Sequence, residues 1–548
     1  MRKILFLFLV ALGQASFAQT SRPNIILILA DDLRDELLPE QGNNFLQATN
    51  IQRLRNEGIR FNNSFGVISL CAPGRASIFT GMYPQQHGIY SNDTVWHLSP
   101  TIPMIHQALQ DSGYYTGFVG KVHVLGNFYP GNNYLAQLKL AAPYTAPGFI
   151  IGGTTYYYPN YVADVIDSLS LSFIRMRDTS KPFYLVMSHK NVHDPYTASP
   201  EFEHLLDTAT IFFPPTFNED ISDKPTYLQP FVLGWSLAKW DSVIKNYYEG
   251  ALSLDKSVGK LMDSLQAWNL LDNTMIIFTS DNGMMIGDHD RQMVKHEPYD
   301  WSLRVPLFVR YPAWFSSGSS YSLNSVLNID LAPTILEAAG VPVLPGMNGI
   351  SLHQFTSGGA TREKFLFEQY IEPGLNYPTY YGVRTNTMKF VRYTCGADTN
   401  EFYDLVLDSL EENNQINNLA YASSIALMDR MLDTLLFSIQ DSMAICDTTI
   451  YHPLHTGNIS WNQEFSFYPN PASDFVLVYP FGTGGKLQLT VCDLLGKPVI
   501  QKVLERKLIP ESALVDISQL PAGSYFISLQ SGDKISTKLL IKTRELIE

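Results

Sequence analysis

The chain has 548 residues, 45% of them hydrophobic and 16% charged, and its 38 basic and 52 acidic side chains give a formal net charge of −14. This composition excludes a disordered protein, a collagen and a small disulfide scaffold, and the length predicts roughly two to four domains. An acidic chain is a poor general partner for nucleic acid or anionic membranes, so an anionic ligand needs a local basic pocket.

The first residues predict export. Arg2 and Lys3 precede the apolar run Ile4–Leu12, and Ser16–Ala18 supplies the small residues that a signal peptidase accepts. This pattern indicates a cleaved signal peptide over residues 1–18. The run is too short for a membrane span, which needs about 20 residues, so the mature protein is expected to be soluble and outside the cytoplasm. In an oxidising compartment Cys395 and Cys446 can pair, and that pairing is left open.

Between residues 23 and 349, short apolar runs alternate with amphipathic helical patterns. Strands are predicted at Ile25–Leu29, Phe183–Met187, Met275–Thr279 and Pro306–Val309. Helices are predicted at Asn50–Gly58 with Thr49 as its cap, at Tyr161–Arg177 and at Asp241–Trp268. This order predicts an α/β fold in which helices cover both faces of a mostly parallel sheet, with ligands bound beyond the carboxyl ends of the strands.

Polar side chains directly follow two of these strands. Asp31 and Asp32 come after the first one, and Asp281 and Asn282 come shortly after Met275–Thr279. Adjacent carboxylates repel unless a cation lies between them, and carboxylate and amide oxygens are ligands of hard cations. Either motif alone is also typical of an ordinary turn. Their meaning therefore depends on what else lies at the same edge of the sheet.

Cys71 begins a third candidate site, in the run CAPGR of residues 71–75. Pro73 is typical of the first turn of a helix, so Cys71 is predicted at or near the amino end of a short helix, where backbone N–H groups favour an anion. The alternative is a buried free cysteine ahead of a helix, because cysteine is among the most buried residue types. The spacing leaves both interpretations open.

The pattern changes after Gly349. Short strands are predicted at Lys364–Tyr370, Tyr380–Thr385, Met388–Tyr393 and 401–405, and then a helix at Ser423–Ile439, which together form a small α+β unit. A linker over 447–463 leads to six strands spaced about 8–12 residues apart, as in a small β-sandwich. They are Phe465–Phe467, Val476–Tyr479, Lys486–Cys492, Pro498–Leu504, Tyr525–Leu529 and Ser536–Ile541.

The ordered motifs resemble those of the formylglycine-dependent sulfatases, of the arylsulfatase type within the alkaline phosphatase superfamily. The pattern Cys71-x-Pro73-x-Arg75 is followed by Thr80-Gly81, with the two acidic pairs upstream and downstream of it. The likeness covers residues 23 to about 420, and its further segments are Gly120–His123, Ser188–Pro195, Lys295 ahead of Tyr299, Arg304–Pro306 and Asp330–Thr334. Chance rarely produces so many ordered motifs over such a length.

The resemblance implies that a formylglycine-generating enzyme oxidises Cys71 to formylglycine, whose hydrate is the nucleophile. It also implies one calcium ion, bound by Asp31, Asp32, Asp281, Asn282 and the modified Cys71. The implied catalytic side chains are Arg75, Lys121, His123, His193 and Lys295, of which all but His123 bind the sulfate. The residue types agree with this, because oxygen ligands suit calcium better than zinc and cations attract a sulfate ester.

The implied reaction is attack of the hydrate on sulfur with expulsion of an alcohol. His193 or Lys295 would protonate the leaving oxygen, and His123 would help to remove a proton from the remaining hydroxyl, which regenerates the aldehyde and releases sulfate. A lone histidine is more often a satisfied polar residue. Lys190 lies within Ser188–Pro195 but is not among the implied site residues, and it is predicted to be a solvated surface charge.

Three positions depart from the family pattern. Gly74 stands where serine is common, Val122 where tryptophan is usual and Asp300 where glutamate is frequent. Gly74 leaves the Cys-x-Pro-x-Arg pattern intact, and Val122 is expected to reshape the pocket wall. The aromatic stretches Asn127–Tyr161 and Pro195–Trp240 are predicted to be specificity loops, in which Tyr156, Tyr157 and Tyr158 are candidates for sugar contacts or for rings folded inward.

The last segment resembles the C-terminal sorting domain of the bacterial type IX secretion system, on the motifs 468–472, 493–497 and 520–525. This implies export to the cell surface or the medium by the type IX machinery, and a carbohydrate-binding module is the alternative. The expected domains are a signal peptide at 1–18, a catalytic α/β domain at 19–350, a sulfatase C-terminal subdomain at 351–446, a linker at 447–463 and a sorting domain at 464–548.

The resemblance implies an exported sulfatase that hydrolyses sulfate monoesters of sulfated glycans, of the hexosamine or glycosaminoglycan type or of other polysaccharides. A phosphatase or phosphodiesterase of the same superfamily is one alternative, but such enzymes commonly combine Thr or Ser with a two-zinc site rich in Asp and His. The other alternative is a noncatalytic glycan binder, which the chain becomes if Cys71 is never oxidised.

Overall fold

The computed structural model describes residues 22–439 and parts of 465–542, apart from a number of short segments. Those segments are 93–97, 100, 125–130, 212, 232–234, 292, 371–376 and 396, and in the last part 469–474, 481–485, 494–496, 506–512 and 532–533. The predicted signal peptide, the predicted linker and Cys446 lie outside the described residues. The cleavage signal and the Cys395–Cys446 pairing therefore stay predictions.

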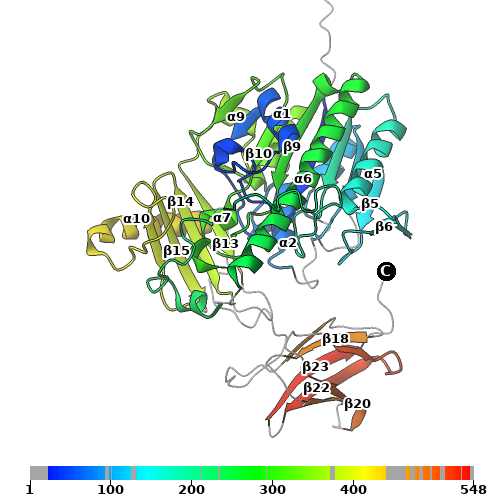
Figure 1. Cartoon of the computed structure of the whole chain (residues 1–548), viewed down its shortest axis with the longest axis vertical. Coiled ribbons are helices and arrows are strands. Elements are labelled where there is room, and N and C mark those ends of the chain that lie inside the picture. The colour runs from blue at the N-terminus through cyan, green and yellow to red at the C-terminus, as the bar shows by residue number, and fades with distance from the viewer. Residues whose placement is uncertain are drawn as a thin grey trace, which may run out of the picture.

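A large mixed sheet forms the body of the molecule (Figure 1). Its strands, in spatial order, are β11 (Ser319–Tyr321), β2 (Ile59–Phe61), β10 (Leu307–Arg310), β9 (Thr274–Ser280), β1 (Asn24–Ala30), β8 (Phe183–Ser188), β4 (Tyr115–Gly120), β5 (Tyr134–Leu138), β6 (Gly148–Ile151) and β7 (Thr154–Tyr157). The central run from β9 to β5 is parallel, whereas β10 on one side and β6 and β7 on the other are antiparallel. The predicted α/β fold is confirmed.

Helices cover both faces of this sheet because its central strands are apolar on both sides. Alternate residues of β1 enter two separate cores, with Ile26 and Ile28 on one face and Ile25 and Leu27 on the other. The first face is covered by α1 (Thr49–Glu57), α5 (Val162–Met176) and α6 (Leu237–Ala267). The second is covered by α2 (Cys71–Thr80), α4 (Ile105–Asp111), α8 (Leu331–Ala339) and α9 (Leu352–Thr356).

The first helix is capped from outside its own sequence. Thr49 was predicted to cap it, but Thr49 is the first helical residue, and Ala48 before it provides no side-chain cap. The carboxylate of Asp255 on α6 accepts from the backbone N–H groups of Asn50, at 2.8 Å, and of Ile51, at 2.7 Å. An acidic side chain more than 200 residues away in the sequence therefore satisfies the helix end.

Several strands of the structure were not predicted from the sequence pattern. Strand β4 contains Gly117, where a Cβ would lie 2.6 Å from the ring of Phe173, so glycine makes room for α5 at the expense of strand propensity. The stretch Asn127–Tyr161 was expected to be a loop, and that is wrong, because it contains β5, β6 and β7. Gly152 and Gly153, both with positive φ, join β6 to β7, as the two-residue turn of a hairpin requires.

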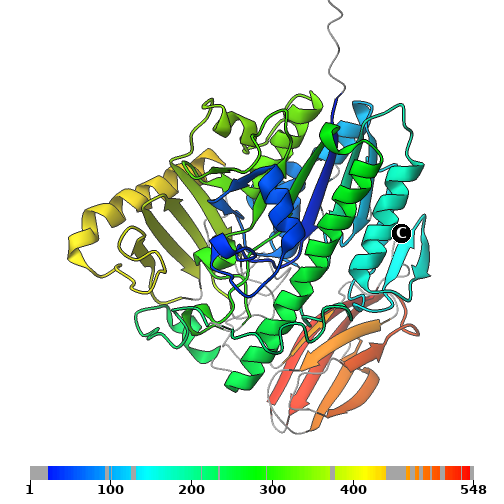
Figure 2. The same cartoon turned by 45° about the horizontal axis from the view of Figure 1, so that its top comes forward.

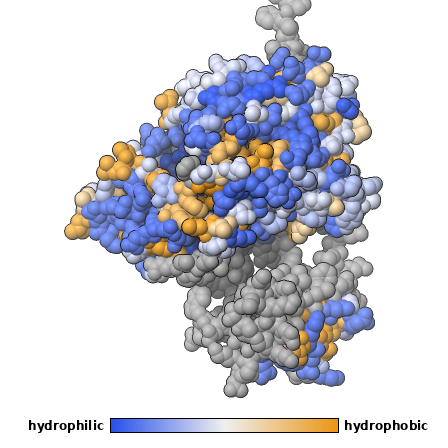
Figure 3. Space-filling model, viewed as in Figure 1, coloured by the Kyte–Doolittle hydropathy of each residue, from blue (hydrophilic) through white to orange (hydrophobic). Residues whose placement is uncertain are grey.

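A second, smaller sheet follows the main one. It is antiparallel, in the order β13 (Lys364–Gln369), β14 (Thr379–Thr385), β15 (Met388–Cys395) and β16 (Glu401–Asp404), and α10 (Ala422–Ser438) packs on it. In both views this unit and the strands β5 and β6 lie on opposite sides of the molecule (Figures 1 and 2). Leu427 and Phe437 of α10 are exposed, and Figure 3 shows hydrophobic residues on the surface at the end of the molecule where α10 lies in Figure 1.

Short elements complete this part of the chain. Helices α3 (Pro84–His87) and α7 (Asp300–Leu303) and the two-stranded pair β3 (Ser64–Phe65) and β12 (Val326–Leu327) connect the larger ones. Among the described residues, none of the helices combines the length and the apolar character that crossing a bilayer requires.

The C-terminal segment is a small β-sandwich, as predicted. One sheet contains β17 (Phe465–Tyr468), β18 (Phe475–Pro480) and β21 (Ala513–Asp516), of which β21 was not predicted. The other contains β20 (Pro498–Glu505), β19 (Lys486–Cys492), β22 (Gly523–Ser531) and β23 (Lys534–Lys542). Val515 of the first sheet shares a core with Leu489 and Ile527 of the second, so the two sheets pack face to face.

Candidate functional site

The parallel strands β1 and β9 bring their carboxyl ends together. Ala30 pairs with Ser280 at the last position of the ladder, so Asp31 and Asp281 follow at the same edge of the sheet. The backbone N–H of Asp32 donates to Asp281 Oδ1 at 3.2 Å. The structure therefore places the two acidic pairs of the sequence side by side.

Helix α2 begins at Cys71 and points its amino end at this edge. Leu70 before the helix provides no side-chain cap, and Asn92 Oδ1 accepts from the backbone N–H of Ala72 at 3.0 Å instead. A Cβ at Gly74 would lie 2.6 Å from the carbonyl oxygen of Asp281. Glycine therefore lets the first turn of α2 approach the end of β9 more closely than any other residue allows.

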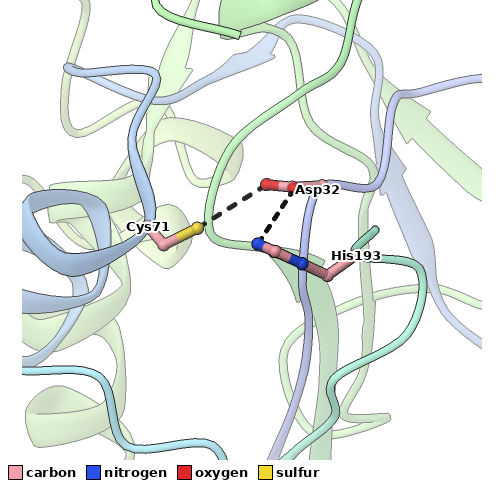
Figure 4. A group of neighbouring side chains, drawn as sticks. All are labelled: Asp32, Cys71 and His193. Atoms are coloured by element: carbon pink, nitrogen blue, oxygen red, sulfur yellow. Dashed lines mark hydrogen bonds and ion pairs between the residues drawn. The ribbon is translucent and has the colours of Figure 1, made fainter. Parts of the chain in front are cut away.

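Three carboxylates and the Cys71 sulfur form a compact buried group. One ligand atom from each of Asp31, Asp32, Asp281 and Cys71 lies within 4.8 Å of the others. Cys71 Sγ lies 3.3 Å from Asp31 Oδ1 and 3.6 Å from Asp32 Oδ1. Figure 4 shows the Cys71 sulfur and the His193 ring both directed at Asp32. If Cys71 is converted to formylglycine, this sulfur marks the place of the formylglycine oxygens.

The donor atoms of this group fit a hard divalent cation. Asp31, Asp32 and Asp281 are at most 2% exposed, and buried carboxylates so close together are costly without positive partners. Asn282 Nδ2 donates to Asp32 Oδ1 at 2.8 Å, whereas the buried Asn282 Oδ1 accepts no hydrogen bond from any described residue. Carboxylate oxygens with a spare amide oxygen are ligands that calcium or magnesium prefers.

Two lysines neutralise the acidic group. Lys121 Nζ lies 2.5 Å from Asp31 Oδ2, and Lys295 Nζ lies 2.5 Å from Asp32 Oδ1 and 2.7 Å from Cys71 Sγ. Burial alone would raise the pKa of Asp31, but the nearby cations, led by Lys121, hold it well below its usual value. Burial alone would lower the pKa of Lys295, but Asp32 and Cys71 raise it well above its usual value. Both lysines therefore remain charged.

The third cation, Arg75, is fully buried and joins three strand ends. Its Nε donates to Asp281 Oδ2 at 2.7 Å, and its Nη1 donates to the carbonyl of Lys121 at 2.8 Å and to Ser188 Oγ at 2.6 Å. The positioning roles of Ser188 and of Asn92 were not predicted. The signal for Ser188 is a hydroxyl at the last position of a buried strand, whereas Asn92 lies beyond α2 without a recognisable motif.

His123 and His193 border the acidic group. Burial, and then Lys121 and Arg75, hold the pKa of His123 well below its usual value, so its ring is neutral. His123 Nδ1 has no hydrogen-bond partner among the described residues. His193 Nδ1 lies 2.9 Å from the carbonyl of Asp194, which makes Nδ1 the donor, and His193 Nε2 faces Asp32 Oδ2 at 3.9 Å.

The backbone at this edge is strained. Asp32 and His123 are not glycines, yet their φ values are +60° and +50°. Such left-handed conformations cost on the order of 1–3 kcal/mol and persist where the surroundings enforce them, often at active sites. The implied metal ligands and catalytic side chains thus lie together at one strained edge of the sheet, whereas Arg304 and Asp330 of the further motifs pair elsewhere, with Asp300 and Arg362.

Lys190 also belongs to this region, and the prediction that it is a solvated surface charge is wrong. Its Nζ donates to the carbonyl of Ala142 at 2.5 Å and lies 4.7 Å from the centroid of the Tyr144 ring. Burial, and then the charge of Lys121, lower the pKa of Lys190. Sequence pattern alone did not reveal this, because the contacts come from a turn about 50 residues away.

Family models match nearly the whole described chain. The model described as Sulfatase matches residues 23–341, and the model described as N-sulphoglucosamine sulphohydrolase, C-terminal, matches residues 287–437. The model described as Secretion system C-terminal sorting domain matches residues 466–543. The resemblances inferred from the motifs are thereby confirmed for both parts of the chain.

Curated relatives agree with these matches. The chain is 28% identical over 511 residues to the N-acetylglucosamine-6-O-sulfatase of Bacteroides thetaiotaomicron, covering 78% of this chain and 90% of the relative. It is 28% identical over 441 residues to the choline-sulfatase of Rhizobium meliloti, covering 73% of this chain and 83% of the relative.

Solved structures share the fold. A complex of a protein with its substrate D-glucosamine-2-N,6-O-disulfate matches with a TM-score of 0.72 and 25% identity, covering 77% of this chain and 99% of that one. The phosphonate monoester hydrolase of Agrobacterium radiobacter matches with a TM-score of 0.64 and 20% identity, covering 76% of this chain and 96% of that one. The second match shows the fold alone.

Proposed function

This chain belongs to the sulfatase family and is an exported sulfuric ester hydrolase, and we propose that it acts on sulfated glycans through residue 71, converted from cysteine to formylglycine. The observation that carries the proposal is the position of Cys71, buried at the start of α2 among three carboxylates and three cations. Burial, and then Asp31, raise the pKa of the Cys71 thiol well above its usual value. The thiol itself is therefore a poor nucleophile at neutral pH.

We propose sulfated hexosamines as the substrate class. Two observations support it: curated relatives are named N-acetylglucosamine-6-O-sulfatase and N-acetylglucosamine-6-sulfatase, and a similar solved structure holds a glucosamine disulfate as its substrate. The sorting domain agrees with a polysaccharide substrate in general, because an enzyme at the cell surface or in the medium meets extracellular glycans.

The charge balance of the pocket supports a bound divalent cation, which we propose to be calcium. Asp31, Asp32 and Asp281 carry three negative charges, and Arg75, Lys121 and Lys295 carry three positive ones, so the side chains alone leave no excess to attract a sulfate. The ligands would be these carboxylates, Asn282 and residue 71. Bound calcium would supply two positive charges and favour deprotonation of a neighbouring hydroxyl.

The cationic side chains then have distinct tasks. Lys121, Arg75 and Lys295 hold the sulfate oxygens, because their raised pKa values keep them charged. Lys295 lies 2.7 Å from the Cys71 sulfur, which places a proton donor beside the reacting atom.

The histidines move protons. The carbonyl of Asp194 holds His193 Nδ1–H, which leaves His193 Nε2 as the atom that protonates the departing alcohol. His123 is neutral and its Nδ1 is without a described partner, so it can accept the proton of the second hydroxyl on residue 71. A formylglycine-generating enzyme is the implied maturation partner, since residue 71 is encoded as cysteine.

Domain limits are proposed from the packing. Helix α9 packs on the core of the large sheet through Leu352 and Phe355, which supports a catalytic domain that extends from residue 19 to about 356 rather than 350. The subdomain then runs to 446, the linker over 447–463 and the sorting domain over 464–548.

Mass spectrometry of the peptide that contains residue 71 tests the proposal. After co-expression with a formylglycine-generating enzyme, the expected peptide has lost its sulfur and carries an aldehyde. Sulfate release from 6-O-sulfated N-acetylglucosamine and phosphate release from its phosphate analogue are then measured side by side. An unmodified cysteine in active protein, or faster release of phosphate than of sulfate, would contradict the proposal.

A further inference from the structure

An exposed aromatic ring is held in place at the edge of the large sheet. Tyr157 on β7 is 70% exposed, and Gly148 on β6 pairs with it across the hairpin. A Cβ at Gly148 would lie 3.0 Å from the Tyr157 ring and 2.9 Å from the side chain of Lys139. The ring therefore lies over the glycine beside the lysine stem, and the rest of its surface faces water.

Lys139 lies beside this ring. Its Nζ lies 5.7 Å from the centroid of the Tyr157 ring and 3.4 Å from the Tyr157 hydroxyl. Tyr156, the next residue along β7, pairs with Phe149 and so points to the opposite face of the sheet. Tyr157 thus offers a flat apolar surface next to a cation, whereas Tyr156 does not.

Direct contacts connect this surface to the catalytic edge. The turn after β5 starts at Lys139, whose carbonyl accepts from the N–H of Ala142 at 3.1 Å, and the carbonyl of Ala142 accepts from Lys190 Nζ at 2.5 Å. The Tyr144 hydroxyl, on the same segment, donates to the carbonyl of His193. Lys190 is therefore connected by direct contacts to the turn that starts at Lys139 and, through its own segment, to the loop that carries His193.

This region carries two cationic side chains, Lys139 and Lys190, although the chain as a whole is acidic. Among the described residues, neither Lys139 nor Lys190 has a carboxylate oxygen within 4.0 Å of its Nζ. An apolar ring surface stacks on the C–H face of a sugar, and unpaired ammonium groups bind sulfate or carboxylate groups. Together they have the chemistry that recognises an anionic saccharide.

We propose that Tyr157, Lys139 and Lys190 form a subsite for the neighbouring saccharide unit of an anionic glycan chain, adjacent to the unit that is desulfated. The sugar ring stacks on Tyr157, Lys139 binds its sulfate or carboxylate, and Lys190 binds an anionic group between the two units. The inference rests on the proposed function and adds that the enzyme acts on chains in preference to single sugars.

Kinetics on two substrates test the subsite. For Tyr157→Ala and for Lys139→Gln we expect kcat/KM on a sulfated tetrasaccharide to fall roughly 5- to 20-fold, mainly through KM, while kcat/KM on 6-O-sulfated N-acetylglucosamine stays within about twofold. Tyr156→Ala is the matched control, since Tyr156 is 49% exposed on the same strand but lies on the other face. It should match the wild type on both substrates.

Equal activity of the wild type and Tyr157→Ala on the tetrasaccharide, or an equal loss in Tyr156→Ala, would overturn the subsite and leave the proposed function intact. Binding of a heparin tetrasaccharide to Cys71→Ala protein, measured by calorimetry with and without Tyr157→Ala, needs no turnover. If no protein releases sulfate from any substrate, the proposed function fails, and this binding comparison still decides on the subsite: weaker binding supports it and equal binding overturns it.

Discussion

Two buried clusters of charged side chains in the catalytic part of this molecule can be compared. They differ in how many of their oxygen atoms are occupied by protein partners. In the cluster between α7 and the small sheet, Asp300 accepts from Arg384 Nε and Nη2, at 3.0 and 2.9 Å, from Arg304 at 3.2 Å and from Lys389 at 2.7 Å. Burial alone would raise the pKa of Asp300, but these cations, led by Arg384, hold it well below its usual value. Both carboxylate oxygens are fully used.

The cluster around Cys71 brings three carboxylates together around one point. Asp31, Asp32 and Asp281 turn an oxygen toward one another and toward the Cys71 sulfur, and the amide oxygen of Asn282 is left without a described partner. The comparison teaches that a saturated cluster holds two units of the fold together, whereas acidic oxygens that converge beside a spare acceptor are arranged for a ligand.

The largest expected effect is the loss of turnover in Cys71→Ala. We expect the rate of sulfate release to fall by more than ~10⁴-fold, the scale seen when a nucleophile is removed. Thermal unfolding should change little, because alanine fits the space of a cysteine. The matched control is Cys492→Ala, which removes the other described free thiol, in the sorting domain, and should leave the rate unchanged. Full turnover by Cys71→Ala would show that residue 71 is not the nucleophile and that the cluster around it is no more catalytic than the cluster around Asp300.

Removal of divalent cations should affect the cluster around Cys71 and leave the cluster around Asp300 unchanged. We expect a chelator to lower activity by at least ~10²-fold and added calcium to restore it, since the cation offsets the three carboxylates. At a calcium concentration 100 times its dissociation constant, binding stabilises the fold by about 2.7 kcal/mol, so melting should shift as well. The midpoint of thermal unfolding with and without calcium checks this. Unchanged activity and unchanged melting after exhaustive chelation would be incompatible with the proposed site.

The sequence predicts which edge of the sheet carries the cluster around Cys71, because that position follows from local sequence patterns. The apolar runs Ile25–Leu29 and Met275–Thr279 predict parallel strands, and parallel strands end at one edge. Pro73 in the first turn predicts that α2 starts near Cys71. Local periodicity and the strand-end rule thus locate the residues that carry the chemistry.

The partners that hold those residues could not be predicted, because they come from distant segments. Asn92 caps α2, Ser188 binds Arg75, and Asp255 caps α1 across more than 200 residues. Lys190 was misread for the same reason, since its contacts lie on the turn after β5. The saturated cluster around Asp300 is equally nonlocal. A single sequence contains no periodicity that predicts such pairs.

Loss of one anion from the saturated cluster should cost stability. We expect Asp300→Ala to lower the free energy of unfolding by about 3–5 kcal/mol, because it leaves Arg384 and Lys389 buried without that carboxylate. Denaturant unfolding measures this. Asp433→Ala is the matched control, because Asp433 is 62% exposed in its ion pair with Arg392 and should cost less than ~1 kcal/mol. Equal effects of the two variants would show that the Asp300 cluster is not a structural joint.

A smaller effect is expected where α2 meets β9. In Gly74→Ser the new side chain would begin 2.6 Å from the carbonyl of Asp281, so the first turn of α2 must move away from the strand end. Overpacking of this kind costs about 1–3 kcal/mol, and we expect sulfate release to slow by roughly tenfold because residue 71 moves with the turn. Gly359→Ser is the control, because Gly359 is exposed, its φ is not positive and a Cβ there would make only ordinary contacts at 3.5 Å or more. Wild-type turnover by Gly74→Ser would show that the close approach is dispensable.

A buried carboxylate outside both clusters shows what burial costs without a full set of partners. Asp167 on α5 is 3% exposed and its ion-pair partner is Lys260, at 3.2 Å. Burial raises the pKa of Asp167 to about 6, although the nearby charge of Lys260 lowers it in part. A raised carboxyl pKa stabilises the fold below the unfolded-state pKa near 3.8, and that contribution is lost as the pH rises through about 6.

We therefore expect Asp167→Asn to be about 1–2 kcal/mol more stable than the wild type at pH 8. This advantage should shrink steadily toward pH 4, because the wild-type side chain is then protonated and neutral like asparagine. Urea unfolding at several pH values, with Asp263→Asn as the exposed control, measures the difference. A constant difference across this pH range would mean that the effect comes from packing and that the charge of the buried Asp167 carboxylate does not limit the stability of α5.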